Sequence, residues 1–295
     1  MVKEELIYID DYQVRCNIWG EENACVIVCL HGLGNSSLSF IEVAEKLKEE
    51  YKIISIDLPG HGKSEKFRTE QEYDMQKMAT WLLKVMKKLD IDKFHLLAHS
   101  YGADIALHFI KEYKSHVKKT ILVDGGYTTK EDFYKIVDEL AKEPDWKWPN
   151  INDVKKEIEY TSKYYNSFEF PSWESFFESE AKSNKNWNHY KKVASSDYVI
   201  EENGKIKLIV DPNVAEFVIK SMANSPIKEV YKQIDSDILI LVATLPEEFN
   251  IINDKLLEDI MSYSKVMIKR IKDSTHMLHW DKPEVVIDEI RRHYN

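Results

Sequence analysis

The sequence predicts an α/β fold with a mostly parallel sheet, interrupted once by a mainly helical insertion. Three observations predict it. Short apolar, β-branched runs alternate with segments of helical spacing as far as Asp124, the next hundred residues lack buried-strand runs, and the alternation then resumes. We therefore expect a core made of residues 1–126 and 226–295, with a cap of residues 127–225 inserted between its two parts.

The expected elements can be placed in chain order. Strands are expected at residues 6–9, 12–19, 24–30, 51–56, 94–98, 120–123, 237–243 and 265–271, and helices at 38–48, 75–89, 101–113, 253–263 and 283–292. The run 24–30 is continuously apolar, which is typical of a strand covered on both faces. The cap contains one expected hairpin, which turns through Asn203 and Gly204.

Composition excludes several classes of partner. The chain has 295 residues, 43% of them hydrophobic, and a formal net charge of −10. An acidic surface repels nucleic acid and anionic membranes, so we expect neither as a partner. The first residues lack a signal-peptide pattern, and the longest apolar run is too short to span a bilayer. With three cysteines, which we interpret as free thiols, these features predict a cytoplasmic location. The oligomeric state is left open.

Ser100 is the central candidate for chemistry. It stands in Ala98-His99-Ser100-Tyr101-Gly102, between an expected strand and an expected helix. A serine on so sharp a turn needs small residues two positions before and after it, and here these are Ala98 and Gly102. The alternative is that Ser100 merely caps the helix. The residues described next favour a nucleophile.

A glycine-rich turn follows the strand 24–30. The sequence there is His31-Gly32-Leu33-Gly34-Asn35, and glycines let backbone approach a ligand closely. We expect the backbone N–H groups of Leu33 and Tyr101 to form an oxyanion hole. Alone, the motif also fits a turn that simply ends a strand.

Together with the stretch Asp57-Leu58-Pro59-Gly60-His61-Gly62-Lys63-Ser64, these two motifs resemble the α/β-hydrolase superfamily in order and spacing. The resemblance covers the core on both sides of the insertion. It implies an eight-stranded, mostly parallel sheet flanked by helices, with a lid inserted after the sixth strand. It also implies that the stretch from Asp57 to Ser64 is a structural loop.

The resemblance further implies a general base, a histidine after the last strand. His276 and His279 are the candidates, and His276 is preferred because it lies a few residues after the strand 265–271. An imidazole can take the Ser100 proton and return it to the leaving group near neutral pH. We expect His279 to pack beside the pocket and His31 to support the oxyanion loop.

The third member of the triad is ambiguous in the sequence. In this family the acid usually follows the seventh strand, where the present chain has Glu247 and Glu248 and no aspartate. Some members carry it after the sixth strand, where Asp124 stands. We expect Glu247, with Asp124 as the main alternative and Glu248 behind them.

The expected function is that of a serine hydrolase, carboxylesterase-like, acting through an acyl-enzyme on a small and fairly apolar ester, lactone or thioester. The aromatic-rich cap favours such a small-molecule substrate. No metal and no organic cofactor are expected, because the sequence lacks a dinucleotide fingerprint and a ligand cluster. Alternatives are a C–C bond hydrolase or an aminopeptidase with the same triad, or a ligand-binding or signalling protein with slow turnover.

Overall fold

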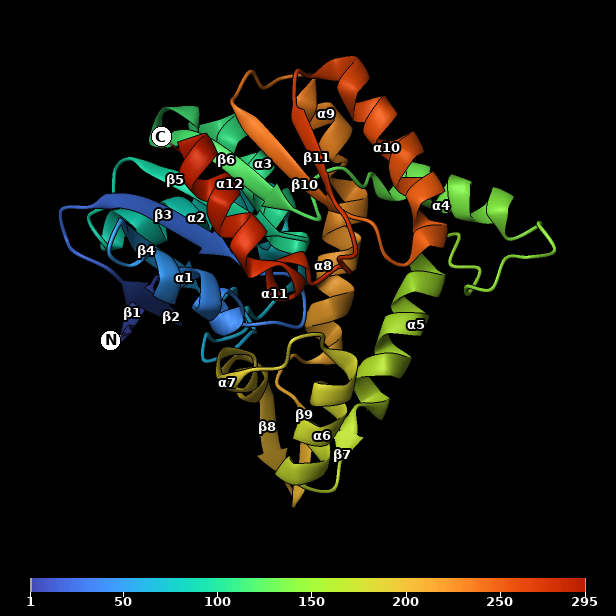
Figure 1. The fold of residues 1–295 in the computed structure, drawn as a ribbon, viewed down its shortest axis with the longest axis horizontal. Helices are drawn as coiled ribbons and strands as arrows, with labels where there is room; N and C mark the ends of the chain where they lie inside the picture. The colour runs from blue at the N-terminus through green and yellow to red at the C-terminus, as the bar shows by residue number, and fades with distance from the viewer. Residues whose placement is uncertain (1, 295) are drawn as a thin grey trace.

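The computed structural model of the chain describes residues 2–294 and contains an eight-stranded sheet, with the strand order β1-β2-β4-β3-β5-β6-β10-β11 (Figure 1). Its strands are β1 (Lys3–Ile9), β2 (Tyr12–Trp19), β3 (Cys25–Leu30), β4 (Tyr51–Ile56), β5 (Phe94–His99), β6 (Val117–Val123), β10 (Ile238–Ala243) and β11 (Met267–Ile271). Strand β2 pairs antiparallel with both β1 and β4, and every other pair is parallel. The predicted fold class is confirmed.

Both faces of the central strands are buried, which explains their unbroken apolar runs. In β3, Val28 and Leu30 join one core cluster, whereas Ile27 and Cys29 join the cluster on the other face. Helices α1 (Ile41–Leu47), α11 (Leu278–Asp281) and α12 (Pro283–Tyr294) pack on the second face, and α2 (Met75–Lys88), α3 (Tyr101–Tyr113), α9 (Ile227–Tyr231) and α10 (Asn250–Tyr263) on the first. The core is thus a three-layer sandwich.

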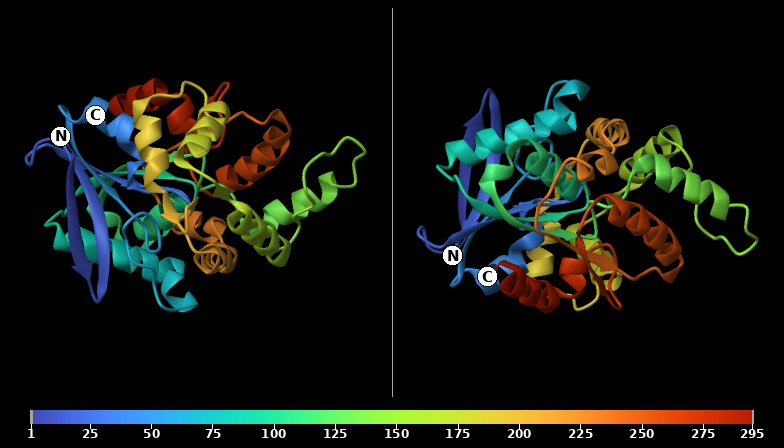
Figure 2. Two further views of the ribbon diagram at one scale, coloured as in Figure 1. Left: turned by 90° about the horizontal axis from the view of Figure 1, so that it is seen from below. Right: turned by 90° about the horizontal axis from the view of Figure 1, so that it is seen from above.

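Between β6 and α9 the chain forms the inserted segment. It contains α4 (Lys130–Leu140), α5 (Val154–Ser167), β7 (Glu169–Phe170), α6 (Trp173–Ser183), α7 (His189–Asp197), β8 (Val199–Glu202), β9 (Lys205–Leu208) and α8 (Pro212–Asn224). The predicted hairpin is present as β8 and β9, with Asn203 and Gly204 both at positive φ. Figure 2 shows α4 and the loop after it projecting from the body of the molecule.

Some details differ from the expectation. The two-residue strand β7, which completes a small sheet with β9 and β8, carries too few residues to show a period. The expected helix 38–48 is divided into a 3₁₀ turn, Ser37–Phe40, and α1. Further short 3₁₀ turns lie at Glu70–Tyr73, Lys114–His116 and Glu247–Phe249. The last inserted helix, α8, packs into the main core through Val214 and Val218.

A buried ion cluster connects the inserted segment to the core. Arg15 of β2 donates to Asp57 Oδ1 at 3.0 Å and to Asp197 Oδ1, at the end of α7, at 2.8 Å. Burial opposes the charge on Arg15, but the bonds to Asp197 and the charge of Asp57 outweigh this and raise its pKa. Asp57 also accepts the backbone N–H of Ser37, so the loop that starts at Asp57 has a structural role.

The three cysteines, Cys16, Cys25 and Cys29, form no disulfide. Within residues 2–294, no helix combines the length and the apolar character that a bilayer crossing requires.

Candidate active site

Ser100 occupies a strained turn between β5 and α3. Its φ is +52° and its ψ −122°, a conformation that non-glycine residues rarely adopt. Its side chain makes no capping hydrogen bond to the helix, so the alternative reading as a helix cap is not supported. The strained backbone instead leaves Oγ free to face a partner outside the helix.

Three glycines allow this turn to close. A Cβ on Gly102 would lie 2.5 Å from the carbonyl oxygen of Leu30, and one on Gly125 would lie 2.6 Å from the Ser100 nitrogen. A Cβ on Gly32 would lie 3.0 Å from Ser100 Cβ. The loops after β3 and β6 therefore both pack against the serine, and side chains at these positions would displace it.

His276 links Ser100 to a carboxylate. Its Nε2 lies 3.0 Å from Ser100 Oγ, and its Nδ1 lies 2.7 Å from Asp124 Oδ2. An ionised carboxylate only accepts, so Nδ1 carries the proton and Nε2 accepts from the Ser100 hydroxyl. The three side chains form one hydrogen-bonded chain in the order that proton transfer from a serine requires.

The carboxylate at His276 corrects the preference for Glu247. Asp124 follows β6, which is paired with β10, and its own backbone N–H donates to Leu241 of β10 at 2.7 Å. Glu247 and Glu248 are exposed in the turn after β10, and among the described residues neither carboxylate is hydrogen-bonded to His276. The backbone after β10 pairs with the loop before His276 through Thr244 and Leu245, which both donate to Ser274 O, but the carboxylate that reaches His276 Nδ1 is that of Asp124.

Asp124 is held by two further donors. Its Oδ1 accepts the backbone N–H of Ala243 at 2.9 Å and the hydroxyl of Tyr127 at 2.8 Å. Together with His276, these donors fix both carboxylate oxygens in a site where Asp124 is 8% exposed. The sequence analysis did not identify Tyr127. The one feature that could have pointed to it is its position three residues after Asp124, which directly follows a strand.

His99 is a buried residue that supports the backbone of His276. Its buried ring lies with Nε2 2.8 Å from the carbonyl oxygen of His276, and the two ring centroids are 4.7 Å apart. Burial holds the pKa of His99 well below its usual value, and the neighbouring His276 and His279 lower it further. The neutral ring therefore donates through Nε2 and fixes the backbone of His276.

The other two histidines near the site are buried supports. His31 accepts the backbone N–H of Leu58 at Nε2 (3.0 Å) and donates from Nδ1 to Gly32 O (2.8 Å), and burial lowers its pKa to about 4. His279 stacks on Phe40, with its Nε2 2.8 Å from Ser39 Oγ, and burial lowers its pKa to about 3. Both rings brace loops around Ser100, as their expected roles require.

Leu33 follows Gly32, which packs against Ser100, and Tyr101 directly follows Ser100 in the chain. Leu33 is in the turn closed by the Asn35 N–H, which donates to Gly32 O at 3.2 Å, and Tyr101 is the first residue of α3. Within residues 2–294, no acceptor is present for the backbone N–H of either residue. Their N–H groups are thus available to a bound molecule, and the N-terminus of α3 adds a positive dipole end.

A cavity of about 250 Å³ opens between the loop after β3 and the inserted segment. Its lining includes Leu33 on one side, Met277 next to the base, and a group of cap aromatics. The His276 side chain is 58% exposed, so the hydrogen-bonded chain is accessible from solvent. A small molecule can therefore reach the hydrogen-bonded chain from solvent, and the cavity lies beside it at Leu33 and Met277.

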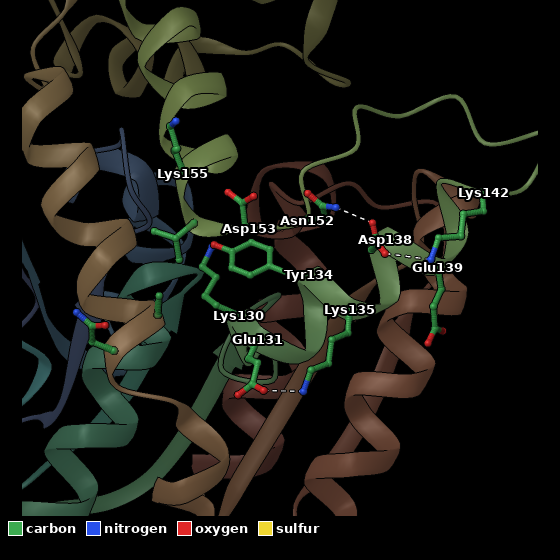
Figure 3. Close-up of a pocket in the computed structure, with 13 residues that line it drawn as sticks. Lys130, Glu131, Tyr134, Lys135, Asp138, Glu139, Lys142, Asn152, Asp153 and Lys155 are labelled. Carbon is green, nitrogen blue, oxygen red and sulfur yellow. Dashed lines mark hydrogen bonds and ion pairs between the residues drawn. The ribbon is translucent and has the colours of Figure 1, made fainter.

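A second, wider pocket is lined by α4, the start of α5 and the end of α8 (Figure 3). Its acidic side chains pair with basic neighbours in the same wall, as in Glu131 with Lys135 and Asp138 with Lys142. No serine, cysteine or histidine is among the described residues that line it. It therefore lacks a nucleophile–base pair, and across residues 2–294 no group of side chains is arranged to hold a metal ion.

Curated relatives match only part of the chain. An uncharacterised protein of Mycobacterium tuberculosis is 33% identical over 118 residues, which are 40% of this chain and 33% of the relative. The uncharacterised hydrolase YugF of Bacillus subtilis is 34% identical over 102 residues, 34% of this chain and 37% of the relative. The chain thus spans about a third of the length of these relatives.

Similarity to solved structures extends over the whole fold. The thioesterase domain from the curacin biosynthetic pathway superposes with a TM-score of 0.72 at 18% identity and covers 99% of both chains. The family model described as the alpha/beta hydrolase fold matches residues 26–192, more than half of the sequence, including the strand, glycine turn and elbow described above. With the eight-stranded sheet in the same order of elements, this match establishes that the chain belongs to the alpha/beta hydrolase fold family.

Proposed function

We propose that the protein is a serine hydrolase that cleaves a small carboxylic ester or a related acyl bond, such as a lactone or thioester. The observation that carries the proposal is the hydrogen-bonded chain from Ser100 through His276 to Asp124. The similarity to the uncharacterised hydrolase YugF and to the thioesterase domain from the curacin biosynthetic pathway is consistent with this reaction class. Asp124 takes the role first expected of Glu247.

In the first half-reaction, Ser100 Oγ attacks the substrate carbonyl carbon while its proton passes to His276 Nε2. The carbonyl oxygen becomes an oxyanion, which the N–H groups of Leu33 and Tyr101 stabilise. Asp124 keeps the imidazole in the required tautomer and stabilises the imidazolium. The intermediate then collapses, and His276 gives its proton to the departing alcohol or thiol.

In the second half-reaction, His276 Nε2 takes a proton from water, and the resulting hydroxide equivalent attacks the acyl carbon. Collapse of this intermediate breaks the bond to Ser100 Oγ, which recovers the proton from His276. The carboxylic acid leaves, and the enzyme returns to its starting state. The partly exposed His276 gives this water a direct path.

The cavity beside Leu33 supports a small substrate. Its volume is about 250 Å³, and Tyr164, Tyr165 and Phe168 contribute to its wall. Pockets for drug-sized ligands start at roughly 300 Å³, so a short acyl or alcohol group fits better than a long chain. We also propose a cytoplasmic location, supported by the three free cysteines.

Active-site labelling tests the proposal. A fluorophosphonate should label the wild-type protein at neutral pH and leave Ser100→Ala unlabelled, and hydrolysis of short p-nitrophenyl esters should disappear in the same variant. Circular dichroism would confirm that the variant is folded. A folded wild-type protein that is neither labelled nor active on these esters would refute the hydrolase proposal and restore the alternative of a binding protein.

A further inference from the structure

The cavity beside the oxyanion loop contains one charged side chain. The lining includes Leu33 of the oxyanion loop, Met277 next to His276, and the aromatic residues Tyr164, Tyr165 and Phe168. Glu180, from α6, is the one residue of this lining with a formal charge. A carboxylate in a largely aromatic wall is an unusual feature that the acyl chemistry at Ser100 does not require.

Glu180 is hydrogen-bonded entirely by neutral groups. Its Oε2 accepts from Tyr198 Oη at 2.7 Å, Ser195 Oγ at 3.0 Å and Asn184 Nδ2 at 3.3 Å. Within residues 2–294, all the hydrogen bonds of this carboxylate are made by Oε2, and no Lys, Arg or His forms an ion pair with it. The side chain is therefore fixed in position while its negative charge remains without a counter-ion.

The walls next to Glu180 offer aromatic faces and edges. The ring centroid of Tyr164 lies 5.8 Å from that of Tyr165 and 5.9 Å from that of Phe168, and both pairs are edge-to-face. Aromatic faces attract cations through their quadrupoles, most strongly when the cation is partly removed from water. An aromatic face turned to the cavity thus favours a cation, as the carboxylate does, whereas a ring edge does not.

This cavity lies beside two residues that adjoin the catalytic centre. Leu33, whose N–H is assigned to the oxyanion hole, and Met277, the neighbour of His276, both line it. A Cβ on Gly34 would lie 2.8 Å from the Tyr165 hydroxyl, so the cap contacts the oxyanion loop directly. A substituent attached near the reacting carbonyl would therefore extend into the cavity.

We propose that the cavity recognises an alkylammonium group, so that the preferred substrates are esters that carry a cationic head on a short chain. The inference rests on the proposed function, because it assigns part of a substrate whose carbonyl lies at Ser100. The net charge of −10 adds an attraction that acts at longer range. Anionic esters, by the same charges, are disfavoured.

Two pairs of isosteric esters test the proposal and distinguish the acyl from the alcohol side. One pair is the p-nitrophenyl ester of γ-trimethylammoniobutyric acid and its analogue with carbon in place of nitrogen. The other is acetylcholine and its carbon analogue. The wild-type enzyme should prefer the cation in at least one pair by roughly tenfold or more in kcat/KM.

Glu180→Gln should remove most of that preference, measured as the ratio of kcat/KM between the cationic and the neutral ester of each pair. Glu178→Gln is the matched control, since Glu178 is an exposed carboxylate on the same helix. Should Glu180→Gln not fold, Tyr165→Leu serves as the second variant, because it removes one aromatic wall and retains the carboxylate. Calorimetric titration with phenyltrimethylammonium gives a readout that does not depend on turnover.

The outcomes separate the two proposals. Ester hydrolysis that depends on Ser100 but shows no preference for the cation in either pair overturns the ammonium site and leaves the hydrolase proposal standing. If no ester is hydrolysed, phenyltrimethylammonium binding that weakens roughly tenfold or more in Glu180→Gln supports the site alone. Equal binding to wild type and Glu180→Gln, or none to either, overturns it.

Discussion

Replacing Asp124 by asparagine should almost abolish turnover. The reason lies in the two donors to Oδ1, the Ala243 N–H and the Tyr127 hydroxyl, which would hold the amide oxygen of the new side chain in that place. The amide NH₂ would then face His276 Nδ1, 2.7 Å away in the native site. Nδ1 would have to accept, so the proton would move to Nε2, where it blocks the transfer from Ser100.

The expected loss is about 10³- to 10⁴-fold in kcat, or roughly 4 to 5.5 kcal/mol of transition-state stabilisation. The assay is steady-state hydrolysis of p-nitrophenyl acetate, with thermal unfolding of each variant as a check on folding. Glu247→Gln and Glu248→Gln are the matched controls and should stay within about twofold of wild type, since both side chains are exposed. An Asp124→Asn enzyme that retains more than roughly a tenth of the wild-type kcat, beside an inactive Glu247→Gln enzyme, would refute the reasoning.

Three further predictions concern the surroundings of the site. Gly125→Ala should lower kcat about a hundredfold, because the new Cβ would lie 2.6–2.8 Å from Ser100 backbone atoms. Gly204→Ala is the control, since Gly204 has a positive φ but a Cβ there would meet no atom within 4 Å. It should leave kcat unchanged and lower the free energy of unfolding by only about 1 kcal/mol. His99→Phe should lower kcat about tenfold with little change in KM, since it removes the donor to His276 O. His99→Gln keeps a donor and should recover part of the loss. Equal kcat in the two variants would contradict the positioning role of His99. Burial raises the pKa of Asp104 to about 7, while the charge of Lys130 opposes the shift. Because the unfolded carboxyl titrates near pH 4, the unfolded state loses its proton between pH 4 and 7 while the folded state keeps it. The stability present below pH 4 therefore declines across this range, by on the order of 4 kcal/mol, and stays at the lower level above pH 7. Asp104→Asn should therefore raise Tm at pH 8 more than at pH 4 in melts against wild type, and an equal shift at both would contradict the assignment.

The sequence was sufficient for those features that depend on local patterns. The run 24–30 is apolar at every position because β3 is covered on both faces, and this marks a central strand without any tertiary information. Ser100 is recognisable because the steric demand for small neighbours falls on fixed positions. His276 follows from its place after the last strand.

The choice of acid could not be made in this way. Strands β6 and β10 are parallel neighbours, with Val123 opposite Leu241, so residues after either strand reach the same edge of the sheet. Which carboxylate points at His276 depends on the backbone direction after each strand. Asp124 has a φ of +42° and is followed by two glycines. The chain after β10 instead places Glu247 in an exposed turn. The sequence favoured Glu247 because the acid usually follows the seventh strand in this family. The backbone conformation after β6 instead brings Asp124 to His276.

The hydrogen bond between Tyr127 and Asp124 has a consequence for how the cap and the chemistry are coupled. Tyr127 is the first residue of the predicted cap, and its hydroxyl is one of the three donors that hold the carboxylate. Loss of this bond would leave more of the charge of Asp124 for His276 and so make the imidazole a stronger base. The residue at which the predicted cap begins therefore contributes to the proton affinity of His276, although it contacts neither that histidine nor Ser100 through a hydrogen bond.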